Sequence, residues 1–230
     1  MKWNKKFQYP SSTRSLINNK RHYDVGEEIL PSVTTILSAT QSDEKKANLA
    51  RWTQSVGENQ AVKIRDQAAE RGSIMHRILE GHLLGQNHAD FSDLGQQAGS
   101  MAQNIIESGI RGHLDEIWGS EITVYYPGLY AGATDLAGIY DGRESIIDFK
   151  QSNKPKRKEW IEDYFMQLAA YAMAHNHIYD TNIQSGIILM CTKDNYFQRF
   201  EVKDKEFQQF SLKWLRRVDK FHSNKHLTHE

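Results

Sequence analysis

The sequence predicts an α/β fold in which helices flank a mixed central β-sheet, with a helical N-terminal portion. Three observations predict it. Helical patterns run to about residue 115, three short β-rich runs follow, and a helix, two strands and a last helix complete the order. Because 230 residues suffice for one substantial core, we expect a single domain over residues 1–230.

An irregular arm and two short helices are expected first. Residues 1–30 form the arm, with a short strand pair around "RHYDVGEEILP". The run "PSVTTILSAT" is typical of a short helix that begins after Ser32, since serine is a good helix cap. The polar residues 42–57 favour a second helix.

The core is expected to span residues 58–222, after an N-terminal part of residues 1–57. Residues 58–84 favour one long helix or two abutting helices, with Gly72 at a junction or at a point of close packing. A further helix is expected over roughly residues 95–115. The first half of the chain is therefore predicted to be helical.

Three β-rich runs follow this helical half. They are "EITVYYPG", "YAGATDLAGIYDG" and "ESIIDFKQS". Pro-Gly and Asp-Gly turn signals separate them, as between the strands of hairpins. We therefore expect an antiparallel meander.

The last part of the chain supplies two helices and two more strands. "RKEWIEDYFMQLAAYAMAHNH" predicts a helix that packs on the sheet through a stripe at helical spacing. The stripe consists of Ile161, Phe165, Leu168 and Ala172. "QSGIILMCT" is apolar on both faces, which favours a central strand, while "YFQRFEV" alternates as an edge strand does. "KEFQQFSLKWLRRVDKF" predicts a closing helix.

The charges of the chain are segregated although the formal net charge is zero. Residues 1–23 contain six basic residues and no acidic one, interleaved with aromatic residues. A second basic run, "NKPKRK", follows the third β-rich run, and "KWLRRVDK" lies near the end. Segregated positive charge can bind phosphate groups in a protein that is neutral overall.

The single cysteine, Cys191, excludes an internal disulfide framework and a four-thiolate metal site. Its apolar neighbours favour a buried structural role. No apolar stretch approaches the length that spans a bilayer, and the first residues lack the apolar segment of a secretory signal. We therefore expect a cytoplasmic protein with no membrane partner.

The stretch "SIIDFKQ" ends an apolar strand with an acid and a base. Because strand side chains alternate, Asp148 and Lys150 share one face while Phe149 points to the other. Asp135 lies among glycine and alanine residues on the preceding run, where small residues often mark close approach by a ligand or another backbone. If a hairpin pairs the two runs, Asp135 lies level with Asp148.

Two carboxylates this close repel each other unless one is protonated or a cation lies between them. A hard divalent metal ion with oxygen ligands resolves the conflict. Lys150 could then orient a water molecule or neutralise charge on a phosphate. His76 and Glu80, one helical turn apart, are candidate additional ligands.

Simpler interpretations exist for each of these residues. Asp148 and Lys150 could form a surface ion pair, and Asp135 could be a solvated acid near a turn. Gln167 and Tyr171, four residues apart on a helix, could be a polar surface pair with an aromatic packed beside the sheet. The combination of acids, lysine and small residues favours a site.

Four motifs in order resemble the PD-(D/E)XK nuclease superfamily and, within it, the RecB-like exonuclease group. They are "RGSIMH", "GATD", "IIDFK" and "QLAAY". The resemblance covers roughly residues 60–200, and it implies a restriction-endonuclease-like core in a single nuclease domain. It also implies one or two Mg²⁺ or Mn²⁺ ions. Relatives that carry an iron-sulfur cluster use four cysteines, so no such cluster is expected here.

The resemblance assigns roles to residues of this sequence. The implied metal ligands are His76, Asp135, Asp148 and the carbonyl of Phe149, with Lys150 as the catalytic lysine. Gln167 and Tyr171 would hold the catalytic site together or touch the scissile strand. Glu80 and Glu121 match the family pattern more loosely. The residues expected to bind nucleic acid are Lys154, Lys156, Arg157, Lys158 and Trp160.

The implied activity is metal-dependent hydrolysis of DNA from single-stranded ends, in repair, recombination or replication. Alternatives are a double-strand-end exonuclease, a structure-specific endonuclease, or a protein that binds nucleic acid without cutting it. A further alternative is an unrelated metallohydrolase that uses His76, Glu80 and His82 on a small molecule. No motif specifies the polarity of digestion or the oligomeric state.

Overall fold

The computed structural model describes residues 1–226, with side chains described up to residue 223. The strands are β1 (Lys2–Trp3), β2 (Ser12–Ile17), β3 (Lys20–Val25), β4 (Glu28–Pro31), β5 (Leu114–Tyr126), β6 (Tyr130–Tyr140), β7 (Arg143–Ser152), β8 (Ser185–Thr192) and β9 (Phe197–Lys203). The α-helices are α1 (Val33–Ala39), α2 (Asp43–Val56), α3 (Glu58–Leu83), α4 (Asp93–Ile105), α5 (Glu162–Tyr179) and α6 (Asp204–His226). A π-helical turn, η1 (Ile106–Ile110), follows α4, and a 3₁₀ turn, η2 (Lys158–Ile161), precedes α5.

A six-stranded mixed sheet in the order β1-β5-β6-β7-β8-β9 forms the centre of the fold. The strands β5, β6 and β7 form the predicted antiparallel meander, β8 runs parallel to β7, and β9 returns antiparallel at the edge. The predicted mixed α/β class is therefore confirmed. The crossover from β7 to β8 is made by α5.

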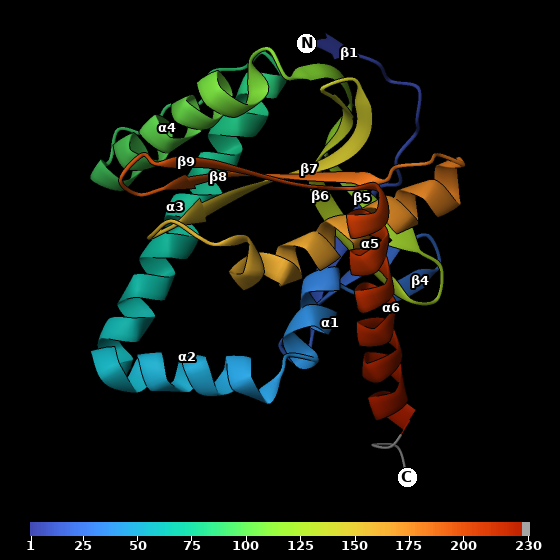
Figure 1. The fold of residues 1–230 in the computed structure, drawn as a ribbon, viewed down its shortest axis with the longest axis horizontal. Helices are drawn as coiled ribbons and strands as arrows, with labels where there is room; N and C mark the ends of the chain where they lie inside the picture. Colours follow the sequence, from blue (N-terminus) through green and yellow to red (C-terminus); the bar gives the residue numbers. More distant parts are fainter. Residues whose placement is uncertain (227–230) are drawn as a thin grey trace.

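Helices cover both faces of this sheet (Figure 1). One hydrophobic cluster joins α1, α5 and α6 to the sheet, and it includes the predicted α5 stripe. A second cluster joins α3, α4 and η1 to the other face, and it contains the buried thiol of Cys191. The alternation of β7 divides its side chains between the two, since Ile146 lies in the first cluster and Ile147 and Phe149 lie in the second.

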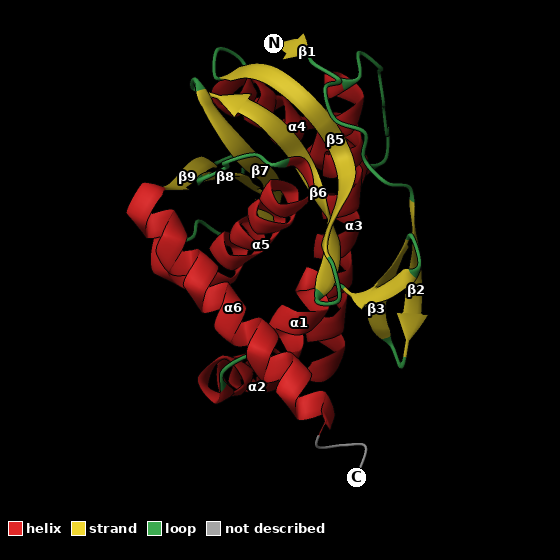
Figure 2. Ribbon diagram, turned by 90° about the vertical axis from the view of Figure 1, so that its right-hand side faces the viewer, coloured by secondary structure: helices red, strands yellow, loops and turns green. Residues whose placement is uncertain are grey.

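The residues before the core form a small separate sheet and two capped helices. The strands β2, β3 and β4 make a three-stranded antiparallel sheet beside the main one (Figure 2). The hairpin of β3 and β4, the helix cap Ser32 and the helix α2 confirm the predictions for this part. The arm is more regular than predicted, because β1 pairs with β5 and β2 pairs with β3.

The helical prediction over residues 95–115 is wrong at its end. The helical turns stop at Ile110, and β5 begins at Leu114. Register shifts between Leu114 and Glu116, and between Ile117 and Gly119, interrupt the pairing of β5 with β6. Such bulges disturb the alternation of apolar and polar residues, which removes the sequence signal of a strand.

The residues of α3 form one continuous helix, so Gly72 marks close packing and not a junction. A Cβ atom at Gly72 would lie 3.3 Å from the Gln151 side chain on β7. The neighbouring Arg71 is buried, and its Nη2 atom donates to Gln151 Oε1 over 2.7 Å. The middle of α3 is thereby held against the end of β7, one residue beyond Lys150.

In the part of the chain that the structure describes, no helix combines the length and the apolar character required to cross a membrane.

Candidate active site

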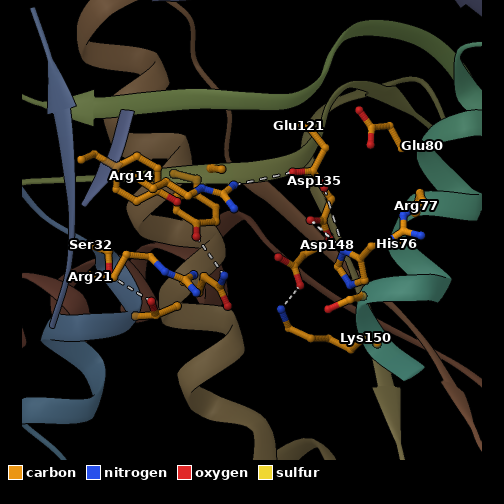
Figure 3. A pocket seen from close by; sticks show the side chains of 18 residues that line it. Arg14, Arg21, Ser32, His76, Arg77, Glu80, Glu121, Asp135, Asp148 and Lys150 are labelled. Atoms are coloured by element: carbon orange, nitrogen blue, oxygen red, sulfur yellow. Dashed lines mark hydrogen bonds and ion pairs between the residues drawn. The ribbon is translucent and has the colours of Figure 1, made fainter. Parts of the chain in front are cut away.

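A pocket of about 500 Å³ opens where α3, the three meander strands and α5 meet the β2–β3 hairpin. The predicted residues that line it are His76, Glu80, Glu121, Asp135, Asp148, Lys150, Gln167 and Tyr171. They come from positions far apart in the sequence (Figure 3). The fold therefore gathers all four sequence motifs at one place.

Strand β7 directs Asp148 and Lys150 into the pocket from one face, as predicted. The Lys150 ammonium contacts Asp148 Oδ2 as an ion pair. Asp148 is only 2% exposed, so the interpretation of a surface ion pair is wrong. Burying a carboxylate is unfavourable unless cations or hydrogen bonds compensate, which here the lysine does in part.

Asp135 reaches the same place from β6 and bridges two elements. Its Oδ2 accepts a hydrogen bond from the Phe149 backbone N–H over 2.6 Å, just beyond the last β6–β7 pair. Its Oδ1 lies 3.3 Å from His76 Nδ1 on α3. The predicted hairpin thus places Asp135 and Asp148 beside each other, and α3 adds the imidazole.

His76, Glu121 and Asp135 could together hold a metal ion. One ligand atom from each lies within 4.8 Å of the others. Glu121 has a left-handed backbone, with φ of 52°, which is uncommon for a non-glycine residue and indicates a position held by its surroundings. Glu80 lines the pocket but is not part of this group among the described residues.

The charges in the pocket shift one another's pKa values. Burial and the negative charge of the neighbouring Asp135 raise the pKa of Asp148 to about 6. Together they outweigh the attraction of the Lys150 ammonium, which lowers this pKa. Burial acts in the same direction on Asp135, but the charge and hydrogen bond of His76, the charge of Lys150 and the Phe149 N–H together outweigh burial and lower the pKa of this carboxyl. Asp135 and Glu121 raise the pKa of His76 to about 10 against the effect of burial.

Gln167 and Tyr171 are buried members of the pocket, so their interpretation as a surface pair is wrong. Gln167 Nε2 donates to Tyr171 Oη over 2.9 Å. Burial and the charge of Asp148 raise the pKa of Tyr171, which keeps the phenol neutral. A Cβ atom at Gly132 would lie 2.5 Å from Tyr171 Cε1. The small residue on β6 thus accommodates an aromatic side chain, whereas the sequence led us to expect a ligand or another backbone.

The basic run after β7 lies outside the pocket. Among the described residues, those lining the pocket do not include Lys154, Lys156, Arg157, Lys158 or Trp160. Lys158 Nζ donates to Glu206 over 2.9 Å, and the Arg157 guanidinium lies 5.3 Å from the centre of the Trp160 ring. The position of this basic run therefore does not support direct contact with a substrate bound in the pocket.

Three other basic residues, all arginines, line the pocket beside the acids. Arg14 and Arg21 line the pocket from the β2–β3 hairpin, and Arg77 lines it from α3. The sequence carried a partial signal for the first two, since both belong to the acid-free basic segment at the N-terminus. His82, required by the small-molecule alternative, does not line the pocket among the described residues.

Comparison with known proteins bears on this site. No protein-family model matches the chain. The human mitochondrial genome maintenance exonuclease 1 is 28% identical over 215 residues, which cover 86% of this chain and 59% of the human protein. The mouse protein of that name is 31% identical over 206 residues, covering 84% of this chain and 59% of its own length.

The chain thus spans about three fifths of the length of the curated relatives it matches. A solved structure of a candidate exonuclease from Eubacterium rectale covers 69% of this chain and 65% of its own, at 14% identity and a TM-score of 0.49. The predicted resemblance to the PD-(D/E)XK nucleases is therefore confirmed: the chain is similar, over most of its own length, to proteins named mitochondrial genome maintenance exonuclease 1.

Proposed function

We propose that this chain is a metal-dependent DNA exonuclease that hydrolyses phosphodiester bonds from single-stranded ends, in repair, recombination or replication. One observation carries the proposal: Asp135, Asp148 and Lys150 converge with His76 in one pocket. The relatives named exonucleases support the same reaction.

The residues present fit a divalent metal ion. Carboxylate oxygens and one imidazole nitrogen are ligands that Mg²⁺ and Mn²⁺ accept, and two buried carboxylates side by side favour a cation. We assign His76, Asp135 and Glu121 as ligands, because they lie close enough together to share an ion. Asp148, which lines the same pocket, and the Phe149 carbonyl are the further ligands that the resemblance implies. The ion would supply Lewis-acid stabilisation of the phosphate and activation of a water molecule.

Lys150 acts on the charge of the reacting phosphate. Burial lowers its pKa, but the charges of Asp148 and Asp135 outweigh burial and raise it, so the side chain is an ammonium at neutral pH. A preorganised cation stabilises charge that develops on phosphate oxygens. Gln167 and Tyr171 position the site, because their hydrogen bond fixes the polar groups of α5 against the acids.

Two features outside the pocket would act on the DNA strand. The exposed residues Lys154 and Arg157 would attract the backbone over a distance, and exposed Trp160 would stack on unpaired bases. Helix α2, which has no buried residue, stands away from the sheet between α1 and α3 (Figure 1). We propose that α1, α2 and α3 restrict access to the pocket so that strand ends are selected.

Digestion of end-labelled DNA tests the proposal. Linear single strands, linear duplexes and circular single strands are incubated with Mg²⁺, Mn²⁺ or EDTA. The proteins compared are wild type, Lys150→Ala, and the control Lys205→Ala at an exposed position on α6. Metal-dependent loss of linear single strands by wild type and the control, but not by Lys150→Ala, is expected.

Other results would contradict particular parts of the proposal. Cutting of circles would indicate an endonuclease, and preferred digestion of duplexes would indicate a double-strand-end exonuclease. Tight binding without cutting in any metal would indicate a protein that binds nucleic acid without catalysis.

A further inference from the structure

The β2–β3 hairpin presents one ordered face beside the pocket. Its strands pair in a register that sets Arg14 opposite Tyr23 and Leu16 opposite Arg21. Directly opposed residues of an antiparallel pair lie on the same face, so these four side chains share one surface. The turn between the strands has left-handed Asn18 and Asn19, as in the tight turns that match strand twist.

That face is directed at the candidate active site. Arg14, Arg21 and Tyr23 all line the pocket. The two arginines extend toward the acids from the side opposite His76 and Arg77 (Figure 3). As diagonal neighbours across two strands, the two residues lie roughly 7–8 Å apart, and their Cβ atoms lie somewhat closer. Two fixed cations thus stand beside an acidic centre without belonging to its candidate metal ligands.

The fold itself uses few of the guanidinium N–H donors, although the Arg14 guanidinium lies 5.6 Å from the centre of the Tyr23 ring. The Arg21 side chain forms no hydrogen bond or ion pair with any residue the structure describes, whereas its backbone carbonyl accepts the Ser32 N–H over 3.0 Å and the Thr35 hydroxyl over 2.9 Å. Arg14 Nη2 lies 3.9 Å from Glu121 Oε2, and its side chain is 56% exposed. The backbone anchors the hairpin, and the guanidinium donors remain available to a ligand.

The chemistry of this face fits a phosphodiester backbone with attached bases. Guanidinium groups bind phosphate oxygens in a bidentate manner. Leu16 follows Arg14 on the same face and is 74% exposed, so an apolar side chain continues the surface beyond the cations. Lys20 and Ile17 project from the opposite face of the same hairpin.

We propose that this face is a binding site for an unpaired polynucleotide strand, in which Arg14 and Arg21 hold backbone phosphates and Leu16 contacts a base. The inference rests on the proposed function, because the hairpin face would hold the segment of the strand that lies next to the bond that is cut. These residues bind and orient the strand and take no part in the chemical step.

Equilibrium binding tests the site separately from catalysis. Fluorescence anisotropy with a labelled oligodeoxythymidylate is measured in Ca²⁺ and in EDTA, over about 50 to 200 mM salt. Arg14→Ala and Arg21→Ala are each expected to weaken binding about 10-fold, in keeping with the loss of a charge-assisted hydrogen bond. The double variant is expected to flatten the dependence of log affinity on log salt by about 1.4, since each phosphate contact contributes about 0.7 in single strands.

Lys20→Ala is the matched control, because it removes one charge from the other face of the same hairpin. Leu16→Ala is expected to weaken binding of the normal oligonucleotide about threefold but not binding of an abasic one, if the contact is apolar and made to a base. Thermal unfolding of each variant verifies that the hairpin remains folded.

The results separate the two proposals. Suppose that the arginine variants and Lys20→Ala all bind the oligonucleotide as tightly as wild type does, while wild type still degrades DNA. The proposed strand-binding site is then wrong, and the exonuclease assignment stands. If wild type neither binds nor degrades polynucleotides with any metal, both proposals are wrong. Weakened binding that is confined to the arginine variants supports the site.

Discussion

Asp135 Oδ2 accepts the Phe149 backbone N–H over 2.6 Å, where the regular pairing of β6 and β7 has ended. One carboxylate oxygen thus continues the interaction between the strands, and the other faces His76. The two aspartates of the site therefore have different structural roles. Asp135 supports the structure of the strand ends, whereas Asp148 contributes a buried charge that the fold tolerates poorly.

The two asparagine variants are therefore expected to differ in stability. The lowered pKa of Asp135 contributes stability above its unfolded value of 3.8, and this is lost as pH falls through the folded pKa. Asp148 has the opposite sign, because a carboxyl whose folded pKa is raised to about 6 costs stability as pH rises from its unfolded value of 3.8 to about 6. At pH 7.5, Asp135→Asn should lower the free energy of unfolding by about 1–3 kcal/mol, and Asp148→Asn by less than about 1 kcal/mol.

Denaturant unfolding in EDTA measures both values. Each variant should also lose at least about 100-fold in the rate of DNA hydrolysis, since each removes a proposed ligand charge. A larger stability loss in Asp148→Asn than in Asp135→Asn would contradict these structural roles of the two aspartates.

Metal binding is expected to release a proton near neutral pH. His76, with a pKa raised to about 10, is protonated at pH 7, whereas an imidazole ligand must be neutral. The affinity for Mn²⁺ should therefore rise as pH increases from about 6 to 9. Calorimetric titrations in PIPES and in Tris report the proton release, and His76→Asn should abolish it. Equal heats in the two buffers would exclude His76 as a ligand.

Gly132→Ala is expected to damage the site through Tyr171. The added methyl group would lie 2.5 Å from Tyr171 Cε1, so the ring must move away from the acids. We expect a loss of about 1–3 kcal/mol of stability and a lower hydrolysis rate. The control is Gly99→Ala, where the nearest side-chain atom lies 3.9 Å away and alanine favours the helix. An unchanged melting temperature in Gly132→Ala would show that the ring is not confined.

Arg217 is expected to matter for stability but not for chemistry. Its Nη2 atom donates to the Leu37 carbonyl over 2.6 Å at the end of α1, and Nη1 lies 3.7 Å from Asp163. Arg217→Ala should cost about 1–3 kcal/mol by leaving polar groups without their partner, with the rate per folded molecule unchanged below the melting transition. The exposed neighbour Arg216 supplies the control variant. Equal melting temperatures of the two variants would contradict this role.

Several residues of the candidate site were predictable because they lie on strongly patterned elements. Strand alternation set Asp148 and Lys150 on one face, and the Asp-Gly turn fixed the hairpin register that brings Asp135 to them. Helical spacing placed Gln167 and Tyr171 together. In each case a local rule determined which side chains are neighbours.

The features that were missed or only loosely matched depend on contacts that local patterns do not encode. Glu121, which matched the family pattern only loosely, reaches the site through an irregular stretch of β5, where bulges and a left-handed residue disturb alternation. The strand β2 is mostly exposed, so it lacks the apolar repeat that marks a strand, and the places of Arg14 and Arg21 depend on it. The basic run from Lys154 to Lys158 had a strong charge signal but lies outside the pocket among the described residues.

The arrangement of the site across α3 and the meander has a consequence for the newly made chain. The β6–β7 hairpin closes through a two-residue turn and is local, whereas the contact between His76 and Asp135 joins distant segments, and non-local contacts form slowly. We infer that a partly folded molecule holds its acids without the imidazole, so that its candidate metal site is incomplete. Pulsed hydrogen exchange during refolding should then show β6 and β7 protected before α3, and the reverse order would refute this.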